Sequence, residues 1–146
     1  MGEKKSFYAK LFAYLLKMLN KYYSCEAIPF EEKQEYEFVT QFHKDLQEVL
    51  EMGPYRVTAE IYRILCSSIQ CRQLQYCSDP KKMLSEIWKI FSYWLGKPFD
   101  AKLQDEILET VGTFCDRWKN EEIAANLLVT FAGEVEEIRK QKKEVA

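Results

Sequence analysis

The chain has 146 residues, of which 47% are hydrophobic, and a formal charge of −2 at pH 7. This length suits one folded domain with a sizeable core, and the near-neutral charge argues against general attraction to nucleic acid. The apolar stretch near the N-terminus is unbroken only from Leu11 to Leu16, which is too short for a secretory signal or for a membrane span of about 18 residues. We therefore expect a soluble, cytoplasmic protein.

Six segments with helical spacing of apolar residues fill the chain almost completely, and only a few residues link one to the next. They cover residues 5–24, 30–52, 55–78, 80–96, 99–118 and 121–142. Within them apolar residues recur at intervals of three and four, and no stretch alternates as a strand does. The sequence predicts an all-α fold, a single-domain irregular bundle of about six helices with short connections, and a frayed tail at 140–146.

The first two segments carry opposite charge. Residues 1–29 contain five lysines and two glutamates, whereas residues 30–53 contain seven acidic residues and two lysines. Two helices joined by a short loop pack as an antiparallel hairpin, and their flanks would then attract each other. We expect a basic first helix beside an acidic second helix.

The later segments indicate which residues form the core. The segment 55–78 is apolar around most of its circumference, which is typical of a central helix. Asp79 and Pro80 form a strong start signal for the fourth segment, whose apolar stripe is centred on Trp94. The stripe of segment 99–118 includes Leu108 and Cys115. We expect these two side chains to be buried.

The sequence contains no recognisable motif for catalysis, for metal binding or for cofactor binding. The single histidine, His43, lies at the edge of an apolar stripe, and Thr40 stands where a di-iron motif would need glutamate. The five cysteines follow no CxxC spacing, so Cys66 and Cys115 are expected to be buried, reduced thiols. No glycine-rich phosphate loop is present. The sequence predicts a non-enzymatic protein without cofactor or metal.

One residue lies where the core does not explain it. Tyr93 points away from the stripe of the fourth segment and shares its side of the helix with Lys82 and Lys89. An exposed tyrosine among charges is a favoured anchor for a protein partner, and Val129 is a weaker example. The predicted function is therefore protein binding, as an adaptor, assembly subunit or inhibitor, with Tyr93, Lys89 and Lys82 in the contact.

Two alternatives remain open, and self-association is compatible with each of them. The first is a nucleic-acid-binding regulatory or accessory protein, whose first helix would offer three lysines for phosphates and a tyrosine for stacking. These residues are Lys10, Tyr14, Lys17 and Lys21. The second is a bundle that binds a small apolar ligand between its helices. Such a cavity would be lined by Met18, Met52 and Met83.

Overall fold

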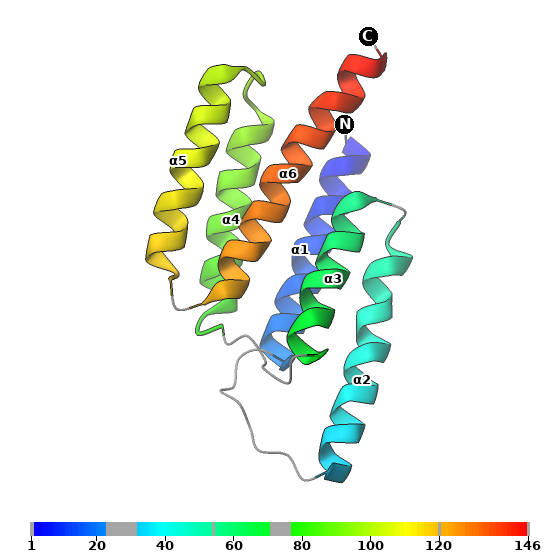
Figure 1. Cartoon of the computed structure of the whole chain (residues 1–146). Coiled ribbons are helices and arrows are strands. Elements are labelled where there is room, and N and C mark those ends of the chain that lie inside the picture. Colours follow the sequence, from blue (N-terminus) through cyan, green and yellow to red (C-terminus); the bar gives the residue numbers. More distant parts are fainter. Residues whose placement is uncertain (1, 23–31, 54, 71–76, 120, 146) are drawn as a thin grey trace.

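The computed structural model of the chain describes residues 2–22, 32–53, 55–70, 77–119 and 121–145. These residues form six α-helices and no strand, which confirms the predicted all-α fold (Figure 1). The helices are α1 (Gly2–Tyr22), α2 (Glu32–Glu51), α3 (Arg56–Gln70), α4 (Pro80–Leu95), α5 (Ala101–Arg117) and α6 (Glu122–Val145).

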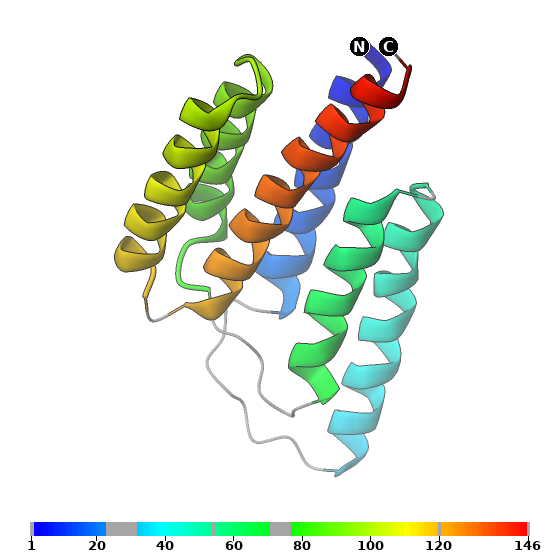
Figure 2. The same cartoon turned by 45° about the horizontal axis from the view of Figure 1, so that its top comes forward.

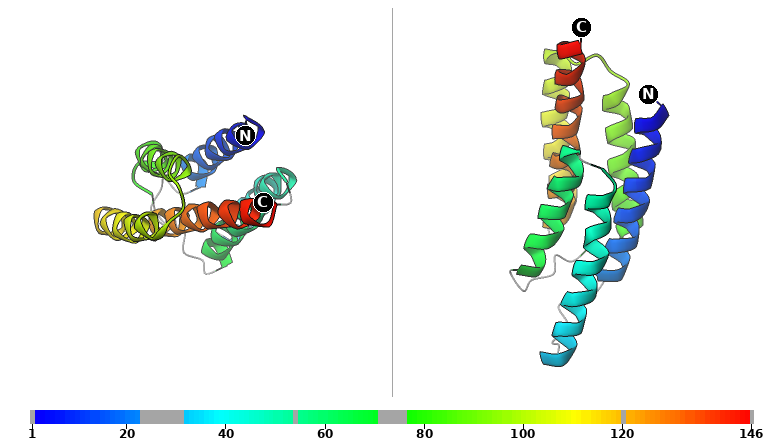
Figure 3. Two further views of the ribbon diagram at one scale, coloured as in Figure 1. Left: turned by 90° about the horizontal axis from the view of Figure 1, so that it is seen from above. Right: turned by 90° about the vertical axis from the view of Figure 1, so that its right-hand side faces the viewer.

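The helices form two layers of three, seen most clearly along their axes (Figure 3). One layer has α1 between α4 and α2, and the other has α6 between α5 and α3. Neighbours within each layer run antiparallel, and α1 starts at the end of the molecule where α6 finishes (Figure 2). The expected antiparallel pairing of α1 with α2 is therefore confirmed.

Aromatic side chains join the two layers. Phe131 of α6 stacks on Phe12 of α1 at 4.7 Å between ring centroids and lies 5.0 Å from Phe91 of α4. Tyr8 meets Phe91 edge to face at 5.0 Å. Trp94 is fully buried, as its position in the apolar stripe predicted. Because these rings come from three helices, the core fixes how the layers sit on each other.

The prediction that the third helix is central is wrong. Helix α3 packs between α2 and α6 at one side of the molecule, whereas α1 and α6 occupy the middle positions. The wide apolar arc of α3 packs against both α2 and α6. Its residues Val57, Ile61 and Leu65 are fully buried. The helix also ends at Gln70, and residues 77–79 are not helical, so the predicted helix to residue 78 is too long.

Helix α5 corrects two expectations about burial. Leu108 is 73% exposed and Cys115 is half-buried, although both belong to the apolar stripe. The helix packs mainly on α6, and its buried side chains are Leu103 and Phe114. The apolar stripe of α5 is wider than the surface that α6 covers, so one edge of the stripe stays in solvent. Leu108 lies on that edge. Cys66 is likewise half-buried, and among the three cysteines that the structure describes the one buried in the core is Cys77.

The other predicted helix ends agree within two or three residues, although positions 23–24, 30–31 and 71–76 lie outside the described residues. Asp79 caps α4 by accepting a hydrogen bond from the Lys82 amide at 3.1 Å. Gly53 follows α2 with a φ of 151°, a conformation that favours glycine. Helix α6 continues to Val145, and the fraying of residues 140–146 stays a prediction.

Candidate functional site

The outward side of α4 brings the predicted partner-binding residues into one row. Lys82, Lys89 and Tyr93 are separated by seven and four positions, which places them on one line along a helix. All three are exposed, and Tyr93 retains 49% of its accessible surface. The structure thus groups these three residues as the sequence indicated.

The Tyr93 ring is held in place by two neighbours. Its hydroxyl donates a hydrogen bond to Glu106 Oε2 of α5 at 3.3 Å, and the Lys97 ammonium lies 5.1 Å from the ring centroid. The sequence analysis missed both, because Glu106 is 13 positions away and Lys97 follows the helix. An anchor that is already oriented loses less conformational freedom on binding.

The outward side of α4 is strongly basic. Its exposed charged residues are Lys81, Lys82, Lys89 and, just past the helix, Lys97. The one carboxylate of the helix, Glu86, is half-buried and accepts a hydrogen bond from the Trp118 indole at 2.7 Å. We call Lys82, Ser85, Lys89 and Tyr93 the α4 row.

The predicted nucleic-acid face on α1 is only partly present. Tyr14 is buried rather than exposed, and its hydroxyl donates to the backbone oxygen of Asp45 at 2.9 Å. It packs under α2, so its ring cannot stack on a base. Lys21 pairs with Asp45 at 2.8 Å and Lys17 with Glu48 at 3.9 Å. Lys10 is exposed. Two lysines of α1 thus pair with acidic residues of α2, as the opposite charges of the first two segments predicted.

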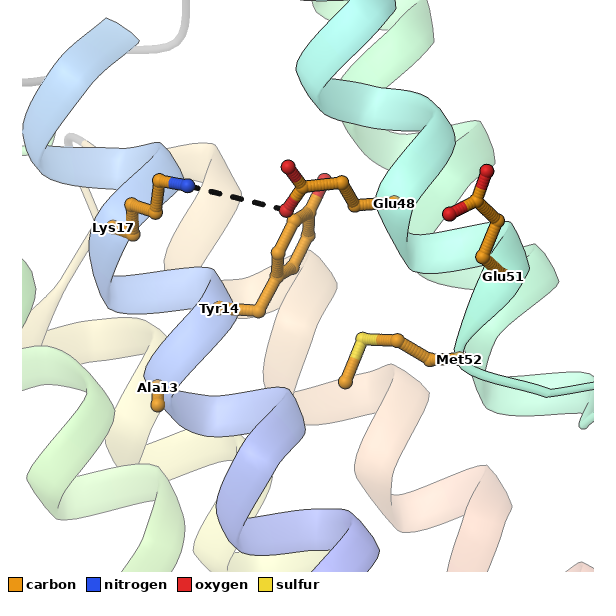
Figure 4. A pocket seen from close by; sticks show the side chains of 6 residues that line it. All are labelled: Ala13, Tyr14, Lys17, Glu48, Glu51 and Met52. Atoms are coloured by element: carbon orange, nitrogen blue, oxygen red, sulfur yellow. Dashed lines mark ion pairs between the residues drawn. The ribbon is translucent and has the colours of Figure 1, made fainter.

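An open groove runs between α1 and α2 (Figure 4). It has a volume of about 510 Å³ and is lined by Ala13, Tyr14, Lys17, Glu48, Glu51 and Met52. The Lys17–Glu48 ion pair crosses it, as Figure 4 shows. Such a groove with charged walls and a wide mouth does not resemble a cavity for an apolar ligand. Met18 and Met83 are fully buried core residues and do not line this groove.

Asp45 is the hub of a polar cluster between α1 and α2. Its carboxylate accepts hydrogen bonds from Tyr22 at 2.5 Å, Lys21 at 2.8 Å and Gln41 at 2.9 Å. Burial alone would raise the pKa of Asp45, but these bonds outweigh burial and hold it below its ordinary value. Burial, together with the bond to Asp45, raises the pKa of Tyr22 to about 12. Because Tyr22 and Lys21 belong to α1 and Asp45 belongs to α2, these bonds hold the two helices together.

A second buried cluster joins α1, α3 and α6. Tyr8 donates its hydroxyl hydrogen to Glu134 Oε1 at 3.0 Å, and Arg56 Nη2 lies 3.7 Å from Glu134 Oε2. Arg56 also donates to the backbone oxygen of Thr130 at 3.2 Å. Burial, and then the nearby Glu134 charge, raises the pKa of Tyr8. Sequence analysis missed Glu134, although its place between Phe131 and Ile138 on an apolar stripe was a signal.

Neither cluster has the arrangement of a catalytic centre. Both pair a carboxylate with tyrosine and a cation, and the bonds of each cluster join one helix to another. His43 is half-buried, as predicted, with its ring 6.0 Å from that of Phe42. Across the residues that the structure describes, no three histidine, cysteine or acidic side chains are grouped as a metal site would need. None of the helices, searched over the same residues, combines the length and apolarity required to cross a bilayer.

Comparisons with protein-family models, with curated proteins and with solved structures found no match for this chain.

Proposed function

We propose that the protein is a non-enzymatic interaction protein that binds another protein through the outward side of α4. The observation that carries this proposal is Tyr93, a large ring that is half exposed yet already oriented by Glu106 and Lys97. Tyrosines held in this way are frequent anchors of protein interfaces. The surrounding lysines favour a partner with an acidic surface, because opposite charges speed encounter and fix orientation.

The alternative of nucleic-acid binding by α1 has less support. Two of its three lysines already pair with acidic residues of α2, and its tyrosine is buried. A phosphate would have to compete with Asp45 and Glu48 for the same ammonium groups. Nucleic-acid binding by α4 has little support either, because Tyr93 is the one exposed ring among the described residues of the α4 row, and single strands usually stack on several rings. We therefore favour the protein partner.

A matched pair of tyrosine variants tests the proposal. Tyr93→Ala should weaken capture of the native partner by more than about 1 kcal/mol, because it removes an anchor from the contact. Tyr36→Ala on α2 serves as the control, since Tyr36 is 74% exposed and α2 lies on the opposite side of the molecule from α4 (Figure 1). Both variants should keep the melting temperature of the wild type.

The measurement is affinity purification from the native host with the tagged full-length chain, followed by titration of the recovered partner. Equal recovery with wild type and Tyr93→Ala would contradict a role for the α4 row. If the recovered ligand is nucleic acid, Lys10→Ala, Lys17→Ala and Lys21→Ala should each lower the salt slope by about one unit. That result would replace the proposed function with the alternative.

A further inference from the structure

The hairpin of α4 and α5 presents two rows of opposite charge side by side. On α5 the exposed residues Asp105, Glu109, Gly112 and Asp116 follow each other at intervals of four, three and four. They form a line along the helix, which we call the α5 row. It carries three carboxylates and no cation, whereas the α4 row carries lysines and no carboxylate. The hairpin lies at one edge of the molecule (Figure 1, Figure 2), and every residue of both rows is exposed.

Contacts across the seam of the hairpin fix how the two rows align. Tyr93 meets Glu106 near one end, and Glu86 meets Arg117 at 3.5 Å near the other. Lys89 lies between Glu86 and Tyr93, and is therefore level with the middle of α5, between Glu106 and Arg117. The charges of the α4 row and the α5 row form no ion pair with each other in this structure. Each row is thus left to attract an external charge.

We propose that the partner of the α4 row is the α5 row of a second copy of this chain, an inference that rests on the proposed function of the α4 face. A twofold axis parallel to the helices, midway between α4 and α5, places each α4 over the α5 of the other copy. This operation preserves helix direction, so the facing helices run antiparallel, as neighbours do inside the molecule. One self-complementary patch then forms two identical sets of contacts.

The side chains match in position as well as in charge. Lys89 of one copy comes level with Gly112 of the other, between Glu109 and Asp116. Gly112 has no side chain, and a Cβ built there would touch nothing within 4 Å. The α5 row therefore has a notch at its middle, where Lys89 can approach the backbone closely. The net charge of −2 adds little repulsion between copies.

The size of the patch predicts a weak and salt-sensitive dimer. Two helices about 24 Å long and about 10 Å wide offer about 500 Å² per copy. That total of about 1,000 Å² lies at the low end for specific interfaces, so we expect a dissociation constant of about 10 to 100 μM. Exposed ion pairs weaken when the Debye length falls from about 30 Å at 0.01 M salt to about 3 Å at 1 M.

Charge reversal tests this arrangement with the full chain. Sedimentation velocity at low salt should show concentration-dependent dimers of the wild type, lost at high salt. Lys89→Glu and Glu109→Lys should each weaken the dimer at least about tenfold, because every reversal acts twice in a symmetric interface. An equimolar mixture of the two variants should form dimers again, since each reversed side chain then faces an opposite charge. The double variant should also self-associate.

Controls separate this result from a general effect of charge. Lys44→Glu makes the same change on an exposed residue of α2, a helix that lies away from the α4–α5 hairpin (Figure 1), and should leave the dimer intact. A wild type that stays monomeric at about ten times the expected dissociation constant at low salt would overturn the inference. So would a mixture of Lys89→Glu with Glu109→Lys that fails to restore dimers. If Tyr93 still supports capture of a different protein in those cases, the proposed function stands and only the second copy is excluded.

Discussion

Replacing Asp45 gives the sharpest test of how α1 and α2 are held together. In the wild type its carboxylate accepts three side-chain hydrogen bonds, of which the shortest, at 2.5 Å, comes from Tyr22. The Tyr22 side chain is buried, so Asp45→Ala leaves a buried hydroxyl without its acceptor, at a cost of about 1 to 3 kcal/mol. Lys21 is half exposed and adds little, because water screens its charge. Including the bond from Gln41, we expect a total loss of about 2 to 4 kcal/mol.

The pH dependence of this loss has a definite sign. Hydrogen bonds hold the pKa of Asp45 below its ordinary value of 3.8 in the folded state. A lowered carboxyl pKa contributes stability that is present above the ordinary pKa and disappears as the pH falls through the folded value. The stability gap between wild type and Asp45→Ala should therefore be widest near neutral pH and should narrow below about pH 4.

Urea denaturation followed by circular dichroism, at neutral and at acidic pH, measures both effects. Glu48→Ala is the control, because its ion pair with Lys17 spans 3.9 Å and both side chains are more than half exposed. It should change the free energy of unfolding by less than about 0.5 kcal/mol. An Asp45→Ala loss as small as that of Glu48→Ala, or a gap that widens in acid, would refute the reasoning.

Two further outcomes follow from the burial pattern. Leu108→Ala should change stability by less than about 0.5 kcal/mol, whereas Phe114→Ala on the same helix should cost about 3 to 5 kcal/mol; equal losses in thermal melts would mean that α5 is rotated. Burial raises the pKa of the Cys77 thiol to about 11, so iodoacetamide near pH 8 should modify Cys66 and Cys115 well before Cys77. Mass spectrometry of the peptides checks this order, and early labelling of Cys77 would contradict its burial.

The errors about Leu108 and Tyr14 have a common origin in the width of apolar stripes. Leu108 and Tyr14 both lie at the edge of such a stripe, where a small rotation of the helix decides between core and solvent. Helix α5 leaves its edge uncovered, so Leu108 is exposed, while α2 covers the edge of α1 and buries Tyr14. The deciding factor in each case is the neighbouring helix.

The buried polar groups show a second limit of local patterns. Asp45 and Glu134 occupy stripe positions beside Phe42 and Phe131, and their acidic side chains are tolerated there because distant residues bond to them. Tyr8 reaches Glu134 across 126 positions of sequence. A periodic pattern can identify such a carboxylate as unusual, but its partner depends on which helices meet.

The sequence by itself determined the helical elements, the start of α4 at Asp79 and Pro80, the burial of Trp94 and the exposure of Tyr93. These features depend on interactions within one helix or on the centre of an apolar stripe, and both are encoded locally. Only the tertiary structure decided the two-layer order of the helices, the burial of Tyr14 and the opposite charged rows of α4 and α5. These properties arise from contacts between distant segments. The packing of one helix on another decides which edge of each apolar stripe is buried and which stays exposed to solvent.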